Sequence, residues 1–171
     1  MIAVTAAGTT DISAAMAGLP EALRGAVRRG LERANDLLER AVAAHAQTPF
    51  GSRAEGHGQL ARSLTGAVSD DNGRQIGEVF LGPPADQYGI FVEVGTRPHF
   101  PPPAAIEAWV RRRLGVTSDR EAQQVAFLIG RKISRRGTPG RFLFERALQE
   151  NEERVVAILE QEVGKVVAGG E

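Results

Sequence analysis

Apolar residues recur at helical spacing from Pro20 onward. Proline suits the first turn of a helix, and the positions that follow it at intervals of three or four residues are apolar. The pattern predicts one amphipathic helix that continues to about His45. Residues 1–18 are small, polar and glycine-containing, so we expect an N-terminal arm over 1–18 and a single domain over 19–171. The apolar positions of the helix are Leu23, Val27, Leu31, Ala34, Leu38 and Val42.

The period changes after residues 48–59, which are rich in glycine and other helix breakers and are predicted to form an exposed loop. Three short apolar-rich segments follow, and they have the length of strands. Asn72-Gly73 separates the first two, and both residues tolerate the positive φ of a hairpin turn. The sequence therefore predicts an antiparallel β-meander of three strands. Its strands are expected at residues 60–68, 75–81 and 88–94.

Helical patterns return in the second half of the chain, after a segment that four prolines stiffen. A helix is predicted from about Pro103 to Gly115, and a capping box of Ser118 and Glu121 opens the next one. A long C-terminal helix should follow Gly140. The fold class is thus α+β, with a small antiparallel sheet packed by a long N-terminal helix and by C-terminal helices. The first helix of this half is expected to bury Ile106, Trp109, Val110 and Leu114, and the next to align Ala122, Val125, Ala126, Ile129 and Ile133 on one face.

Composition excludes several classes of protein. The 171 residues are 42% hydrophobic and contain no cysteine, so a disulfide framework, a cysteine-ligated zinc and a thiol nucleophile are excluded. No apolar run approaches the roughly 18 residues of a membrane span, and the N-terminus lacks the pattern of a secretory signal. We therefore expect no membrane association.

Charge is segregated along a chain that is neutral as a whole. Residues 97–141 carry 10 basic and 3 acidic residues, whereas residues 142–171 carry 3 and 7. A basic block can mark a nucleic-acid surface, and opposite patches on one chain also suit a head-to-tail oligomer. The basic candidates for contact with a partner or with DNA are Arg111, Arg112, Arg131, Lys132, Arg135, Arg136 and Arg141.

These cations need a partner outside their own helix. Arg131 with Arg135, and Lys132 with Arg136, are spaced at i,i+4, where like charges repel. Nucleic acid is one partner to consider, and acidic groups of the same or a neighbouring copy are another. Aromatic residues that could stack on bases are scarce, so protein partners are favoured. Residues 134–141 are expected to form a protruding charged loop.

No constellation of residues indicates catalysis. His45, His57 and His99 lack the spacing of metal ligands on one helical turn, and no nucleophile or phosphate-binding motif is present. Glu93 interrupts an apolar segment and could serve as a general base, which leaves a small hydrolase or transferase using His99 as a rival. We favour a structural role for Glu93, either paired with Arg97 or accepting backbone N–H groups of the tight turn that follows it. The prediction is a protein without catalytic residues, metal or cofactor.

Three motifs follow the amphipathic N-terminal helix in a definite order. An element with the pattern Gly-x-Leu-x-x-Ser comes first, then a hydrophobic-Glu-x-Gly-Thr segment, then a Gly-Thr-x-x-x-Phe-Leu element before the last helix. Here these are Gly58-Gln59-Leu60-Ala61-Arg62-Ser63, Tyr88-Gly89-Ile90-Phe91-Val92-Glu93-Val94-Gly95-Thr96 and Gly137-Thr138-Pro139-Gly140-Arg141-Phe142-Leu143. Taken in this order, they resemble the tail-completion, or head-to-tail joining, family of long-tailed bacteriophages and prophages, and the resemblance covers about residues 20–165.

The resemblance implies a structural protein of the virion, made in the host cytoplasm and located in the neck or tail. It implies a homo-oligomeric ring, expected to be a hexamer, that completes the tail and joins it to the DNA-filled head. Expected partners are the head connector or adaptor, the tail tube proteins and the packaged DNA. The expected structural turn comprises Glu93, Gly95, Thr96 and Arg97. The alternative is a small nucleic-acid-binding module that uses the basic region 111–141.

Overall fold

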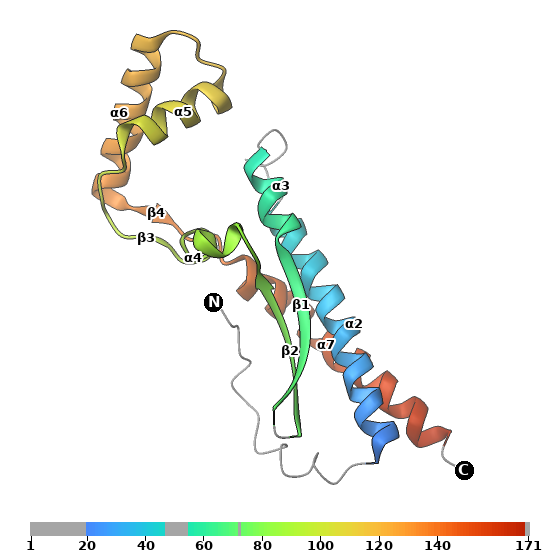
Figure 1. Cartoon of the computed structure of the whole chain (residues 1–171). Coiled ribbons are helices and arrows are strands. Elements are labelled where there is room, and N and C mark those ends of the chain that lie inside the picture. Colours follow the sequence, from blue (N-terminus) through green and yellow to red (C-terminus); the bar gives the residue numbers. More distant parts are fainter. Residues whose placement is uncertain (1–19, 47–54, 72, 170–171) are drawn as a thin grey trace.

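The computed structural model describes residues 20–46, 55–71 and 73–169 (Figure 1). Two long helices and a β-hairpin form a body, from which two shorter helices project. The helices are α2 (Glu21–Ala46), α3 (Glu55–Arg62), the 3-10 helix η1 (Ala85–Gln87), α4 (Gly89–Glu93), α5 (Pro103–Leu114), α6 (Asp119–Arg136) and α7 (Leu143–Ala168). The strands are β1 (Leu64–Asp71), β2 (Arg74–Leu81), β3 (Gly95–Thr96) and β4 (Thr138–Pro139).

Helices α2 and α7 pack antiparallel along the body. Gly30 lies against Leu159, where a Cβ atom would be 2.8 Å from the leucine Cδ2, so the absence of a side chain lets the helices approach closely. Nearby, the buried Glu162 of α7 forms ion pairs with Arg29 and Arg33 of α2 and, at 2.6 Å, with Lys165. Apolar contact and this ion-pair cluster together hold the two long helices.

Strands β1 and β2 form an antiparallel hairpin that lies along α2 (Figure 1). At the turn, Gly73 has a φ of 84° and donates its N–H to Asp70 Oδ1 at 2.9 Å. On the side facing α2, the buried Asn35 donates its Nδ2 to the Ala67 carbonyl oxygen at 2.8 Å. Gly66 leaves room for the Asn35 side chain, because a Cβ atom at position 66 would lie only 2.9 Å from the Cβ atom of Asn35.

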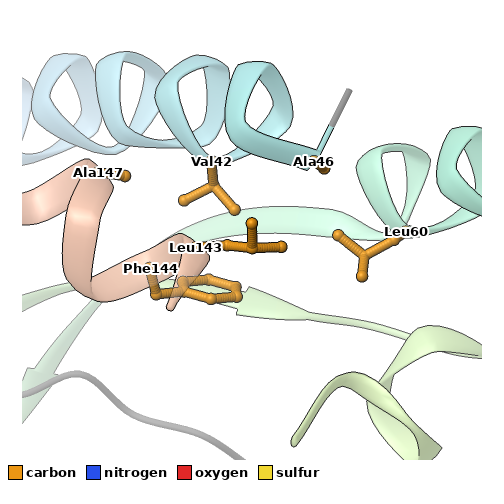
Figure 2. Packing of buried hydrophobic residues seen from close by; sticks show 6 residues of the cluster. All are labelled: Val42, Ala46, Leu60, Leu143, Phe144 and Ala147. Atoms are coloured by element: carbon orange, nitrogen blue, oxygen red, sulfur yellow. The ribbon is translucent and has the colours of Figure 1, made fainter. Parts of the chain in front are cut away.

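The main core joins α2, α3 and α7 (Figure 2). Val42 and Leu143 are almost completely buried, and their side chains point toward each other across the α2–α7 contact. Phe144 and Leu60 extend the cluster toward the hairpin and α4. The buried members of this core are Val42, Ala46, Leu60, Leu143, Phe144 and Ala147.

The α+β class and the packing of the hairpin by the long N-terminal helix are confirmed, but the third predicted strand is wrong. Residues 85–93 form η1 and α4, so the sheet that contains the hairpin has two strands. Short apolar runs do not distinguish strand from helix by periodicity alone. A helical turn places Tyr88 and Val92, four residues apart, on the same side, and both pack against the main core.

Two further boundaries differ from the prediction. Residues 55–62 form α3, so the part of the expected loop 48–59 that the structure describes is helical, and β1 begins at Leu64 instead of at residue 60. Leu60 therefore reaches the main core from a helix, with 3% of its surface exposed. The predicted N-terminal arm, residues 1–18, lies outside the described residues.

Candidate interaction surface

Helices α5 and α6, which we call the helical projection, extend away from the body (Figure 1). A small core of their own holds them together, formed by the buried residues Val110, Ala122 and Ala126. Gly115 ends α5 in the left-handed conformation, at φ 69°, and Ser118 caps α6 by accepting the N–H of Glu121 at 3.5 Å. Both sequence signals for these helices are thereby confirmed.

Strands β3 and β4 pair as a short ribbon that connects the helical projection to the body. The hydroxyl groups of Thr96 and Thr138 are 2.6 Å apart, and the Thr138 N–H donates to Thr96 Oγ1 at 3.1 Å. Gly95 and Gly137 have φ values of 79° and 67°, and a Cβ atom on either would overlap a carbonyl oxygen of the opposite strand. Only glycine satisfies both requirements at these two positions.

The carboxylate of Glu93 caps the first turn of α7. It accepts the backbone N–H groups of Leu143 at 2.7 Å, Phe144 at 3.1 Å and Glu145 at 3.3 Å. The Glu93 carbonyl oxygen accepts a further N–H from Phe142 at 3.0 Å. A negative charge at a helix N-terminus also interacts favourably with the helix dipole. Glu93 is 6% exposed, and its carboxylate is occupied by backbone groups.

Three of the four residues of the predicted structural turn have a structural role, and these roles are of two kinds. Gly95 and Thr96 form β3, and Glu93 fixes the start of α7, 50 residues further along the chain. The expected pairing of Glu93 with Arg97 is wrong. Arg97 is exposed, and its carbonyl oxygen lies 2.9 Å from His99 Nδ1.

The helical projection exposes large apolar side chains. Trp109 and Leu114 are 41% and 54% exposed, so the prediction that both are buried is wrong. Only Val110 of α5 is fully buried, because within the described residues α5 packs mainly on α6. The exposed apolar residues of this region are Phe100, Trp109, Leu114, Phe127 and Leu128.

A shallow hollow of about 250 Å³ lies between the start of α5 and the middle of α6. Phe100 and Phe127 line it together with Ile106 and Pro103. Gly130 forms part of its wall, and a Cβ there would be 3.3 Å from the Phe100 ring. The hollow is large enough for an apolar side chain of a partner protein.

The structure separates the predicted basic residues into three groups. Arg111 is paired with Asp119 at 2.6 Å and closes the α5–α6 turn. Arg141 lies on the body, apart from the cations of α6, and its guanidinium donates to the His45 carbonyl oxygen at 3.2 Å. The remaining five are exposed and form no ion pair with any residue in the described ranges: Arg112, Arg131, Lys132, Arg135 and Arg136.

The predicted protruding loop at residues 134–141 is wrong. Ser134 to Arg136 complete α6, Gly137 is buried, and residues 138–139 form β4. The glycines and the proline of this segment form the tight ribbon, in which Gly140 lies close to the Glu93 carbonyl oxygen. Arg135 and Arg136 are therefore displayed on the last turn of α6.

A second exposed apolar group lies near the root of the helical projection and was not predicted. Ile90, Phe91 and Val94 are 37% to 56% exposed on and beside α4, and Phe142, at the start of α7, is 44% exposed. A strand was expected at residues 88–94, and the helical turn found there instead leaves these side chains exposed. Like Phe127 and Leu128, they require a covering partner or remain in water.

The candidate histidines His45 and His99 lie in different parts of the structure. His45 Nε2 lies 3.0 Å from a carboxylate oxygen of Glu150 on the body, whereas His99 lies beside Arg97 at the base of the helical projection. Among the residues placed by the structure, no group of three or more histidine or acidic side chains could hold a metal ion. No helix in that part of the chain is long and apolar enough to cross a membrane.

Comparisons with protein-family models, with curated proteins and with solved structures found no significant match for this chain. The similarity to the tail-completion family therefore remains a prediction based on the three sequence motifs.

Proposed function

We propose that this protein is a structural component of a phage or prophage particle. In this role it assembles into a ring, expected to be a hexamer, at the neck or the top of the tail, where it completes the tail and joins it to the head. Its contacts would be copies of itself, the head connector or adaptor and the tail tube proteins. The assignment is non-enzymatic and places the protein in the virion.

One observation supports this proposal above the others. The helical projection is held out from the body by a tightly built ribbon, yet it exposes Phe127 and Leu128 at 57% and 61%. Exposing such residues on a rigid projection is costly for an isolated subunit and favourable once a partner covers them. The positions of Gly95, Thr96 and Glu93 also give a structural reason for the Glu-x-Gly-Thr motif on which the family resemblance depends.

The test is self-assembly of the purified chain, followed by analytical ultracentrifugation and negative-stain electron microscopy. Wild-type protein is expected to form rings, and Phe127→Ser is expected to raise the concentration for half-assembly at least tenfold. Val167→Ser is the control, because Val167 is also an exposed apolar residue, at 68%, but lies near the end of α7, away from the helical projection, and this variant is expected to assemble as the wild type does. A chain that stays a single subunit at all concentrations and salt conditions would contradict the proposal.

A nucleic-acid-binding module is the second candidate, supported by the five exposed cations that form no ion pair within the described ranges. The apolar residues among them argue against it, since a phosphate backbone offers no apolar surface to cover Phe127. Affinity carried by phosphate contacts would fall steeply with salt, with a slope of about −0.9 per neutralised phosphate on double-stranded DNA. Absence of DNA or RNA retention at low salt would exclude this candidate.

A further inference from the structure

One face of α6 combines positive charge with exposed apolar side chains. Its members recur at helical spacing on the side that does not carry the buried residues Ala122 and Ala126. Every member is exposed, and Arg131 and Arg135 are neighbours on this face without an acidic partner among the described residues. We call this the α6 face: Arg120, Gln124, Phe127, Leu128, Arg131 and Arg135.

One face of α7 has the opposite character. It lies on the side away from the buried residues Ala147 and Asn151, and Val156 at its centre is 48% exposed. Glu152, Glu153 and Glu160 form no ion pair in the part of the chain that the structure describes. We call this the α7 face: Glu145, Gln149, Glu152, Glu153, Val156 and Glu160.

We infer that the α6 face of one subunit packs against the α7 face of the next copy of this chain. The two faces are complementary in charge, and each has exposed apolar residues among its charged ones, namely Phe127 and Leu128 on α6 and Val156 on α7. At about 1.5 Å per residue, the 18 residues of α6 span roughly 27 Å and the 26 of α7 roughly 39 Å, so α7 can accommodate α6 along its length.

The α6 face and the α7 face cannot pack against each other within one subunit. The ribbon of β3 and β4 directs α6 away from the body, while α7 runs along the body in another direction (Figure 1). A contact between two different faces of identical copies is heterologous, and it closes into a ring or continues as a filament. Apolar burial at Phe127, Leu128 and Val156 would drive the contact, and the charges would fix its register. This inference rests on the proposed function only for the claim that copies associate.

Charge reversal on each face separately tests the pairing. The first variant combines Arg131→Glu with Arg135→Glu, and the second combines Glu152→Lys with Glu160→Lys. Each alone is expected to raise the concentration for half-assembly at least tenfold, because its altered face repels the unaltered face of its copies. An equimolar mixture is expected to assemble again, with the two variants alternating, since each kind of contact then joins opposite charges. Circular dichroism verifies that both variants remain folded.

The control variant combines Arg74→Glu with Arg97→Glu, which changes the charge by the same amount at exposed positions outside the α6 face and the α7 face. It is expected to assemble as the wild type does. If the wild type forms rings and the two variants form them equally well, the inference is overturned and the proposed function stands. The inference is also overturned if the first variant no longer binds nucleic acid and an equimolar mixture of the two variants does not assemble, because the cations of α6 would then be a nucleic-acid contact. A wild type that never associates would contradict both proposals.

Discussion

Replacing Glu93 by alanine removes the acceptor on which the first turn of α7 depends. In the structure its carboxylate accepts three backbone N–H groups, and those of Leu143 and Phe144 belong to residues that are 2% and 5% exposed. In the variant no side chain replaces these oxygens, and the site is too deeply buried for bulk water to do so fully. The start of α7 also carries the largest residues of the main core, so loosening it affects the whole body.

The magnitude follows from the number of buried donors that lose their partner. A buried donor without an acceptor costs about 1 to 3 kcal/mol, so Glu93→Ala should lower the free energy of unfolding by about 3 to 5 kcal/mol for the two buried N–H groups and the lost charge. Glu93→Gln keeps one neutral acceptor and should cost about 1 to 2 kcal/mol, mainly through the interaction with the helix dipole. Against a typical total of roughly 5 to 15 kcal/mol, the alanine variant is severely destabilised.

Urea unfolding followed by far-ultraviolet circular dichroism measures both changes as a shift of the midpoint at constant slope. Asp86→Ala is the matched control, because Asp86 is an exposed carboxylate in η1, seven residues before Glu93, and forms no ion pair with the residues described. The control should change the free energy of unfolding by no more than about 0.5 kcal/mol. An alanine variant at position 93 as stable as this control would refute the role of Glu93 as a cap.

Two further predictions concern the ribbon and the α2–α7 contact. Gly137→Ala places a Cβ against the Thr96 carbonyl oxygen at a residue whose φ is 67°. The variant should open the ribbon and lower the free energy of unfolding by roughly 1 to 3 kcal/mol. Amide hydrogen exchange over β3 and β4 should accelerate, and unchanged protection there would contradict this account. Hydrogen bonds from Lys165 and Arg33 lower the pKa of Glu162 from 4.5 to about 2. Glu162 therefore stabilises the folded chain above pH 4.5, and this contribution is lost as the pH falls from about 4.5 to about 2. Glu162→Gln should flatten the loss of stability in that window in thermal unfolding, and a variant with the wild-type slope would show that the cluster does not contribute.

Elements with local signals were predicted closely. The first long helix was expected from Pro20 to about His45 and is found at Glu21–Ala46, and the helix opened by Ser118 begins at Asp119. Their boundaries depend on caps and on periodicity, which are properties of neighbouring residues. The segment at residues 88–94 lacked such signals, and contact with a core contributed by distant helices decided that it is helical.

The candidate surface was only partly predictable for a related reason. Periodicity identified the apolar side of α5 but not the number of elements that cover it, so Trp109 and Leu114 were wrongly assigned to the core. Proximity in sequence grouped Arg141 with Arg135 and Arg136, whereas the ribbon separates them by turning the chain back to the body. The significance of Phe127 and Leu128 is apparent only when nothing else is seen to pack on their side of α6 among the described residues.

The long N-terminal helix, the hairpin and the segregation of charge follow from local sequence signals, because each depends on residues that are neighbours along the chain. Long-range contacts instead place the Glu93 carboxylate at the start of a helix that begins 50 residues later, and they hold α5 and α6 away from the body. These features arise from hydrogen bonds and steric limits between segments distant in sequence, such as the overlap that any side chain at Gly95 or Gly137 would create.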